Sequence, residues 1–282
     1  MPILNLKNVQ LEYREYGSGD RYLLCCQQSH SQVVNYTIDL AEKCGFHVFN
    51  IVIRGYGNST HILEDLGDAW YDVWAQDTCD FADAMGIDKF FYTGVSHGAG
   101  IGWYLCIYHQ ERLRGFFGVV AGPHSKDGVD TGEARMRTIR AAESRETWDA
   151  FCEEMERSNP LVRKPNMTDK QWEIARALHE ERMAGWRNMS LEEGRLNVKK
   201  PFPRQKTEEE LIDILSKITV PTLLLGGMRD PISLPANLLR SCGAVKNSKL
   251  ILYEDAGHGL DTVHTDEIVT DIVEFCRARH LL

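Results

Sequence analysis

Short apolar runs alternate with helix-like stretches along the first half of the chain, and this alternation restricts the fold more than any other feature of the sequence. Strand-like runs are expected at residues 9–13, 22–26, 47–53, 89–93 and 115–121. Helices with apolar residues at helical spacing are expected between them, at residues 35–44, 69–85 and 98–109. Such alternation favours right-handed crossovers. It therefore predicts an α/β fold with a mostly parallel sheet covered by helices on both faces.

The pattern changes between residues 127 and 218, where strand signals vanish and charge rises. Helices are expected there at residues 132–144, 147–158 and 168–188, and three helix starts have the capping-box pattern: Thr168 with Gln171, Ser190 with Glu193, and Thr207 with Glu210. Strands resume at residues 222–225 and 250–253, followed by a closing helix at 265–278. We therefore expect a core in two parts, residues 1–126 and 219–282, with residues 127–218 inserted as a helical cap.

The composition restricts the class of protein. A chain of 282 residues with 43% hydrophobic and 26% charged residues can bury one large core and is typical of a globular protein. A net charge of −9 argues against nucleic-acid binding, which depends on a positive surface. No segment reaches the roughly 18 apolar residues of a membrane span, and no signal peptide is evident, so we expect a cytoplasmic protein that acts on a small molecule and not on a membrane. The eight cysteines have no regular spacing, which predicts reduced, mostly buried thiols.

The most informative motif is the G-x-S-x-G sequence from Gly94 to Gly98, which lies between an expected strand and an expected helix. A serine on such a tight turn is held above the sheet in a strained backbone, and small neighbours are needed because a Cβ would clash there. The N-terminal end of the following helix also favours negative charge beside the serine. This context favours Ser96 as a nucleophile over the alternative, a glycine-rich turn whose serine only caps the helix.

A serine hydroxyl needs a general base, and the base needs a carboxylate that orients it. Both residue types occur in turns after later expected strands: Asp230 follows the strand at 222–225, and His258 follows the strand at 250–253. The chain order Ser, Asp, His is that of α/β-hydrolases and differs from the orders in chymotrypsin and subtilisin. Asp255 is an alternative acid, although a carboxylate three residues from the histidine is poorly placed to orient it.

Four segments resemble signatures of the α/β-hydrolase superfamily: residues 54–59 (Arg-Gly-Tyr-Gly-Asn-Ser), 94–98, 221–230 and 256–258 (Ala-Gly-His). They span nearly the whole chain outside the helical insertion and follow the order of the family. The resemblance implies the α/β-hydrolase fold, with a mostly parallel eight-stranded sheet flanked by helices and with a helical cap. It also implies a catalytic triad of Ser96, Asp230 and His258, with no cofactor and no metal.

The chain departs from the family after the strand at 22–26. Many relatives have His-Gly there, and the second residue's backbone N–H binds the oxyanion together with the N–H that follows the nucleophile. This chain reads Gln-Gln-Ser-His-Ser-Gln at residues 27–32. The resemblance implies oxyanion donors at His97 and Gln28. Ser29 and His30 are candidates for substrate binding, and for His30 a second proton-transfer role and a plain surface position both stay open.

Two further residues are candidates for substrate contact. His124 follows the strand at 115–121 at the junction with the expected cap, where a purely structural role is the alternative. Trp186 lies in the insertion, whose aromatic residues either line a lid over the serine or hold the small core of the cap.

Two enzyme classes compete for the function. The first is hydrolysis of a small ester, lactone, amide or activated carbon–carbon bond by Ser96, as in the similar capped hydrolases of ring degradation. The second is a cofactor-free dioxygenase on the same fold with His258 as general base; in those enzymes the acid follows an earlier strand, whereas residues 118–125 here have no carboxylate. A ligand receptor is disfavoured because all three triad members are present. A homodimer is left open.

Overall fold

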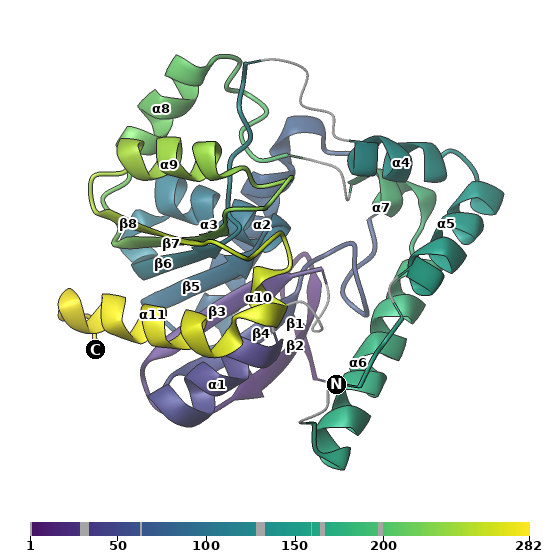
Figure 1. Ribbon diagram of the computed structural model, residues 1–282, viewed down its shortest axis with the longest axis horizontal. Coiled ribbons are helices and arrows are strands. Elements are labelled where there is room, and N and C mark those ends of the chain that lie inside the picture. The colour runs from purple at the N-terminus through teal and green to yellow at the C-terminus, as the bar shows by residue number, and fades with distance from the viewer. Residues whose placement is uncertain are drawn as a thin grey trace.

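An eight-stranded sheet forms the centre of the computed structural model (Figure 1). The structure describes residues 2–28, 34–62, 64–127, 133–158, 160–163, 167–196 and 200–282. The strands are β1 (Ile3–Asn5), β2 (Gln10–Tyr16), β3 (Tyr22–Gln27), β4 (His47–Val52), β5 (Phe90–Val95), β6 (Leu113–Val119), β7 (Thr222–Gly227) and β8 (Ser248–Tyr253). Their spatial order is β1-β2-β4-β3-β5-β6-β7-β8. The pairings of β1 with β2 and of β2 with β4 are antiparallel, and those from β4 to β8 are parallel, so the mostly parallel sheet expected from the sequence is confirmed.

Helices cover both faces of this sheet. On one face lie α1 (Val34–Cys44) and α11 (Thr265–Ala278), and on the other lie α2 (Trp70–Ala84), α3 (His97–Tyr108) and α9 (Pro235–Ala244) (Figure 1). The short α10 (Leu260–Val263) precedes α11. Parallel strands need crossover connections, and in this chain the crossovers are helices that bury both faces of the sheet.

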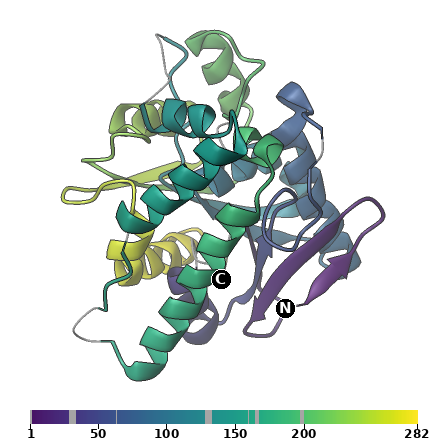
Figure 2. The same ribbon diagram turned by 90° about the vertical axis from the view of Figure 1, so that its right-hand side faces the viewer.

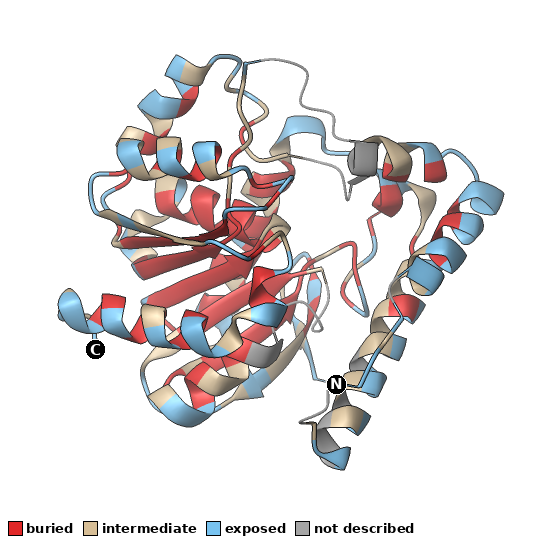
Figure 3. Cartoon of the chain, viewed as in Figure 1, coloured by how far each residue is buried: buried red, intermediate tan, exposed pale blue. Residues whose placement is uncertain are grey.

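The strands are buried on both sides because their apolar side chains alternate between two core layers. Phe116 of β6 packs with Trp103 in the α2 and α3 layer, whereas its neighbour Phe117 packs with Phe275 in the α1 and α11 layer. Successive side chains of a strand point to opposite faces, so near-continuous apolar runs are what a sheet between two helical layers requires. The central strands are accordingly almost entirely buried (Figure 3).

A helical segment separates β6 from β7 in sequence. It contains α4 (Glu133–Ala141), α5 (Arg145–Ser158), α6 (Asp169–Asn188), α7 (Leu191–Leu196) and α8 (Glu208–Ser216). The helices α5 and α6 run beside each other across one side of the core (Figure 2). Trp148 of α5 and Trp186 of α6 stack with ring centroids 5.8 Å apart, which joins the two helices through a small aromatic core. By contrast, α8 packs against α9 of the core.

Glu193 of α7 ties this helical segment to the loop after β4. Its buried carboxylate accepts hydrogen bonds from the backbone N–H groups of Ile62 (3.0 Å) and Ser190 (2.8 Å), and it contacts His61 Nδ1 (2.8 Å). The Ser190 hydroxyl accepts in turn from the Glu193 N–H (3.0 Å), which completes a capping box at the start of α7. One carboxylate thus satisfies donors from two distant parts of the chain.

The predicted elements agree with the structure to within a few residues, and the capping box at Ser190 is confirmed. At Thr207 only half of the box forms: the Thr207 hydroxyl accepts from the Glu210 N–H (3.2 Å), whereas the Glu210 carboxylate accepts from the N–H of Lys206 (2.6 Å). The Gln171 side chain of the third box lies outside the described residues. Among the helices and strands named above, β1, α9 and the short α10 were not predicted. No helix in the described part of the chain is both long and apolar enough to cross a membrane.

Candidate active site

Ser96 lies between β5 and α3 in an unusual backbone conformation. Its φ is 50° and its ψ is −104°, and a positive φ is uncommon and strained for a residue with a Cβ. Its N–H donates to the carbonyl of Val119 (2.9 Å), which fixes the turn to the end of β6. Although Ser96 occupies the N-cap position of α3, its hydroxyl makes no capping hydrogen bond. The hydroxyl therefore stays available for another partner.

Two glycines make this turn sterically possible. A Cβ on Gly94 would lie 2.4 Å from the carbonyl carbon of Gly98, and a Cβ on Gly98 would lie 2.3 Å from the carbonyl oxygen of Cys26. Both distances are far below van der Waals contact, and the obstructing atoms are backbone atoms that cannot turn away. A larger residue at either position would push β5, α3 or β3 apart, so the need for small residues around Ser96 has a direct steric cause.

His258 joins Ser96 to Asp230. Its Nε2 lies 2.9 Å from Ser96 Oγ, and its Nδ1 lies 2.9 Å from Asp230 Oδ2 and 3.1 Å from Oδ1. The three residues follow β5, β7 and β8, whose carboxyl ends meet at one edge of the sheet. The structure thus brings together the three residues that the sequence nominated as a triad.

Asp230 is held as an acceptor by its own turn. Its carboxylate accepts hydrogen bonds from the backbone N–H groups of Ile232 (2.8 Å) and Ser233 (2.9 Å), and the residue is only 2% exposed. Burial favours the neutral carboxyl, but the contact with His258 and the two backbone donors outweigh it and lower the pKa of Asp230. An ionised carboxylate therefore faces His258 Nδ1 at neutral pH.

Asp255, the alternative acid, lies elsewhere. Its carboxylate is 3.1 Å from His264 Nε2, and its side chain is 61% exposed. Asp230 is therefore the acid that contacts His258 in this structure.

A cavity of about 170 Å³ opens beside Ser96. His258 and His97 line it, and Gln28 and His124 also contribute to its wall. The predicted site residues Gln28, His97 and His124 thus border the same space as the serine. Ser29 and His30 lie outside the described residues.

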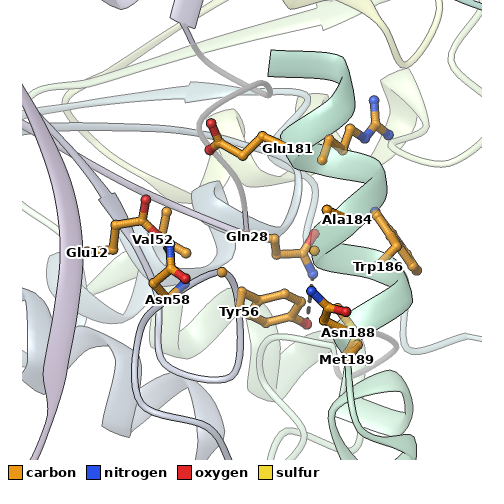
Figure 4. A pocket seen from close by; sticks show the side chains of 13 residues that line it. Glu12, Gln28, Val52, Tyr56, Asn58, Glu181, Ala184, Trp186, Asn188 and Met189 are labelled. Carbon is orange, nitrogen blue, oxygen red and sulfur yellow. Dashed lines mark hydrogen bonds between the residues drawn. The ribbon is translucent and has the colours of Figure 1, made fainter. Parts of the chain in front are cut away.

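Trp186 lines a second cavity, of about 160 Å³, between the core and α6. Tyr56 and Asn58 form part of the core side, while Trp186 and Asn188 belong to α6 (Figure 4). Gln28 lines both cavities and donates from Nε2 to the Tyr56 hydroxyl (3.0 Å). The two cavities therefore adjoin at this side chain.

Two supporting residues were not identified from the sequence. The buried Gln27 donates from Nε2 to the carbonyl of Val95 (3.1 Å), next to Ser96. Ser233 accepts from the N–H of Gly122 (2.8 Å) at the wall of the first cavity. No local signal indicates the contact of Ser233, because Gly122 is distant in the chain. No local signal indicates Gln27, because its partner is distant in the chain.

The arrangement can transfer a proton. A neutral imidazole with Nδ1–H directed at Asp230 presents Nε2 as an acceptor to the Ser96 hydroxyl, which is the geometry of a general base beside a nucleophile. The N-terminal end of α3 adds positive potential at the same point. Among the residues that the structure describes, no group of three or more His, Cys, Asp or Glu side chains is arranged to hold a metal ion.

Comparison with protein families matches residues 26–260 to the family described as "alpha/beta hydrolase fold". A search of curated proteins found no similar protein.

Solved structures resemble the chain over nearly its whole length. An enol-lactonase from Burkholderia xenovorans LB400 superposes with a TM-score of 0.73 at 18% identity, with coverage of 98% of this chain and 100% of that one. A meta-cleavage product hydrolase from Pseudomonas fluorescens IP01 has a TM-score of 0.73 at 17% identity, covering 99% and 98%. A thermophilic esterase from Thermogutta terrifontis has a TM-score of 0.70 at 19% identity, covering 98% of each chain. At these identities the likeness concerns the fold.

Proposed function

The chain belongs to the α/β-hydrolase fold family and is an enzyme of that fold, and on this premise we propose that it hydrolyses a small acyl substrate with Ser96 as the nucleophile. The observation that carries the proposal is the hydrogen-bonded series from Asp230 through His258 to Ser96, at the edge of a cavity. The cavity volume fits a small substrate, and the three structural neighbours act on an enol-lactone, an ester and a meta-cleavage product, as their names state. Candidate substrates are therefore small esters, lactones, amides and activated carbon–carbon bonds.

In the proposed reaction, Ser96 Oγ attacks the substrate carbonyl carbon while its proton moves to His258 Nε2. Asp230 orients the ring through Nδ1 and stabilises the imidazolium that forms. His258 then donates the proton to the leaving group, which departs as the acyl-serine ester is produced. A water molecule attacks this ester after losing a proton to His258, and the proton returns to Ser96 as the acid product leaves.

The oxyanion formed by each attack needs donors. We assign the backbone N–H of His97, at the start of α3, and that of Gln28 to this role, and both residues border the cavity beside Ser96. The Gln28 side chain is occupied with Tyr56, so its backbone is the part assigned to the oxyanion.

We also propose that the helical segment at residues 127–218 is a cap, between core parts at 1–126 and 219–282. Its α6 borders the second cavity, and Pro201 borders the first, so this segment encloses space next to Ser96. Ser29 and His30 stay candidates for substrate contact.

The test is covalent labelling. A fluorophosphonate probe should modify the protein at Ser96, located by peptide mass spectrometry, and Ser96→Ala should lose both the label and turnover of a panel of aryl esters and lactones. We expect turnover to fall by a factor on the order of 10⁴ or more, because the substitution removes the nucleophile and leaves only substrate binding and oxyanion stabilisation. Unchanged turnover in a folded Ser96→Ala protein would exclude the proposal, and oxygen uptake in its place would favour the dioxygenase.

A further inference from the structure

Arg182 of α6 is a cation in an unusual environment. It lines the second cavity, and its Nε is completely buried without a hydrogen-bond partner. Two other arginines of the same helix have acidic partners: Arg176 lies 3.8 Å from Glu180, and Arg187 pairs with Glu156. Among the described residues, by contrast, no carboxylate forms an ion pair with Arg182.

The acids near Arg182 are engaged with other groups. Glu181, which lines the same cavity, pairs with Arg14 at 2.6 Å, and Glu12 accepts from the backbone and side chain of Asn58. Asp261 interacts with Arg182 electrostatically without forming an ion pair. Burial lowers the pKa of Arg182, whereas Asp261 opposes this effect.

Asp261 is influenced by both Arg182 and the catalytic histidine. Asp261 follows His258 by three residues, and both His258 and Arg182 influence its pKa. Both charged side chains therefore lie within electrostatic range of Asp261. Gln28 lines both cavities, so the space beside Arg182 adjoins the space beside Ser96.

We propose that Arg182 binds a carboxylate of the substrate, at a position separate from the bond that Ser96 cleaves. This inference rests on the proposed hydrolase function and narrows the substrate class to anionic acyl compounds. A buried Nε–H without an acceptor is unfavourable, and a carboxylate supplies the two parallel acceptors that a guanidinium prefers. The second cavity is then the site of the acidic end of the substrate.

The kinetic test compares ester pairs that differ in one charge. The mono-4-nitrophenyl esters of glutarate, adipate and pimelate are measured against 4-nitrophenyl pentanoate, hexanoate and heptanoate. In the natural protein, kcat/KM should favour the anionic ester at the best-fitting chain length. Arg182→Met should lower the anionic-to-neutral ratio by about tenfold or more, and Arg182→Lys should retain part of the preference.

Arg176→Met is the matched control, because it removes an exposed cation from the same helix and should leave the ratio unchanged. Loss of preference in Arg176→Met equal to that in Arg182→Met would assign the effect to general charge and overturn the proposal. Thermal unfolding checks the fold: since Arg182 lacks an ion pair, Arg182→Met should not lower the melting temperature.

A binding measurement separates this inference from the proposed function. Calorimetric titration of Ser96→Ala with monomethyl adipate and dimethyl adipate needs no turnover. Binding should be tighter for the monoacid, and the added Arg182→Met substitution should remove that difference. Equal binding of both compounds to Ser96→Ala, or an undiminished difference in the double variant, would overturn the role of Arg182 even if Ser96 is the nucleophile.

Discussion

Two residues that line the cavity have backbone conformations that residues other than glycine rarely adopt. Ser96 has a φ of 50° and Val120 a φ of 45°, and a β-branched residue with positive φ is a genuine outlier. Val120 is fixed there by its N–H bond to the carbonyl of Leu225 (2.7 Å), and it lines the cavity beside Ser96. Strained residues persist only where the surrounding structure determines them, and here parallel strands on either side provide that constraint.

The role of Asp230 can be tested against that of Asp255. Asp230→Asn removes the charge that orients His258 and should lower kcat on a Ser96-dependent ester by on the order of 10³–10⁴. Asp255→Asn is the matched control because its carboxylate is exposed and lies beside His264, so steady-state kinetics should change by less than about twofold. A large loss confined to Asp255→Asn would reverse the assignment.

Asp261 gives the stability a pH dependence. Burial raises its pKa from 3.8 to about 6, so the folded protein holds this proton more tightly than the unfolded chain does. The free energy of unfolding therefore loses a contribution as the pH rises from about 4 to about 6. The Asn of Asp261→Asn does not titrate, so this variant does not lose stability in that pH range. The free energy of unfolding of Asp261→Asn relative to the natural protein, measured in urea, should therefore be higher at pH 7.5 than at pH 4.5, by on the order of 1–2 kcal/mol. Equal effects at both pH values would contradict a raised pKa.

At the scale of elements, the contact between α7 and the loop after β4 depends on one side chain. Glu193→Gln replaces an acceptor oxygen by an NH₂ group, so at least one of the donors from Ile62, Ser190 and His61 loses its acceptor. An unsatisfied buried donor costs about 1–3 kcal/mol, and we expect the free energy of unfolding to fall by about 2 kcal/mol.

The adjacent Glu192 provides the control for this substitution. It is 52% exposed and lies 3.6 Å from Arg195, so Glu192→Gln should change stability by less than about 0.5 kcal/mol. Denaturant unfolding of both variants makes the comparison. If the two variants have the same stability, Glu193 does not hold the segment.

The elements that the sequence predicted well are those with a strong local pattern. The nucleophile turn was recognisable because Gly94 and Gly98 are sterically required on either side of Ser96. The strand β1 is only three residues long and its residues are not fully buried, so it leaves little periodicity to detect. The helix α9 begins with Pro235, a favourable first-turn residue, but its apolar pattern is short.

At the scale of the whole molecule, the sequence indicated the sheet and the three residues that meet at its edge. It did not indicate the second cavity or the unpaired Nε of Arg182, because both arise where α6 packs beside the core. Burial and ion pairing between distant segments have no local signature. The Gln27 contact with Val95 was missed for the same reason.

The eight free cysteines provide a test of the whole fold. Six are buried, and Cys44 and Cys242 are partly exposed. Burial also raises the pKa of Cys276 to about 12, which suppresses the reactive thiolate. Titration with Ellman's reagent should therefore modify at most two thiols rapidly in the native protein and eight after denaturation. Fewer than eight in the denatured protein would indicate a disulfide, and rapid reaction of most thiols in the native protein would contradict the buried positions.

The pairing of β6 with β7 has a consequence for synthesis on the ribosome. Residues 120–221 separate the two strands, so β6 is synthesised well before β7. Until β7 has been translated, one edge of β6 has no strand to pair with. At about 5–20 residues per second, translation of that stretch takes on the order of 5–20 s. During this interval the nascent sheet exposes an apolar edge to other chains, and Ser96 has neither its acid nor its base. The nascent chain therefore has no assembled triad while the helices between β6 and β7 are being translated. During the same interval its open strand edge exposes it to aggregation.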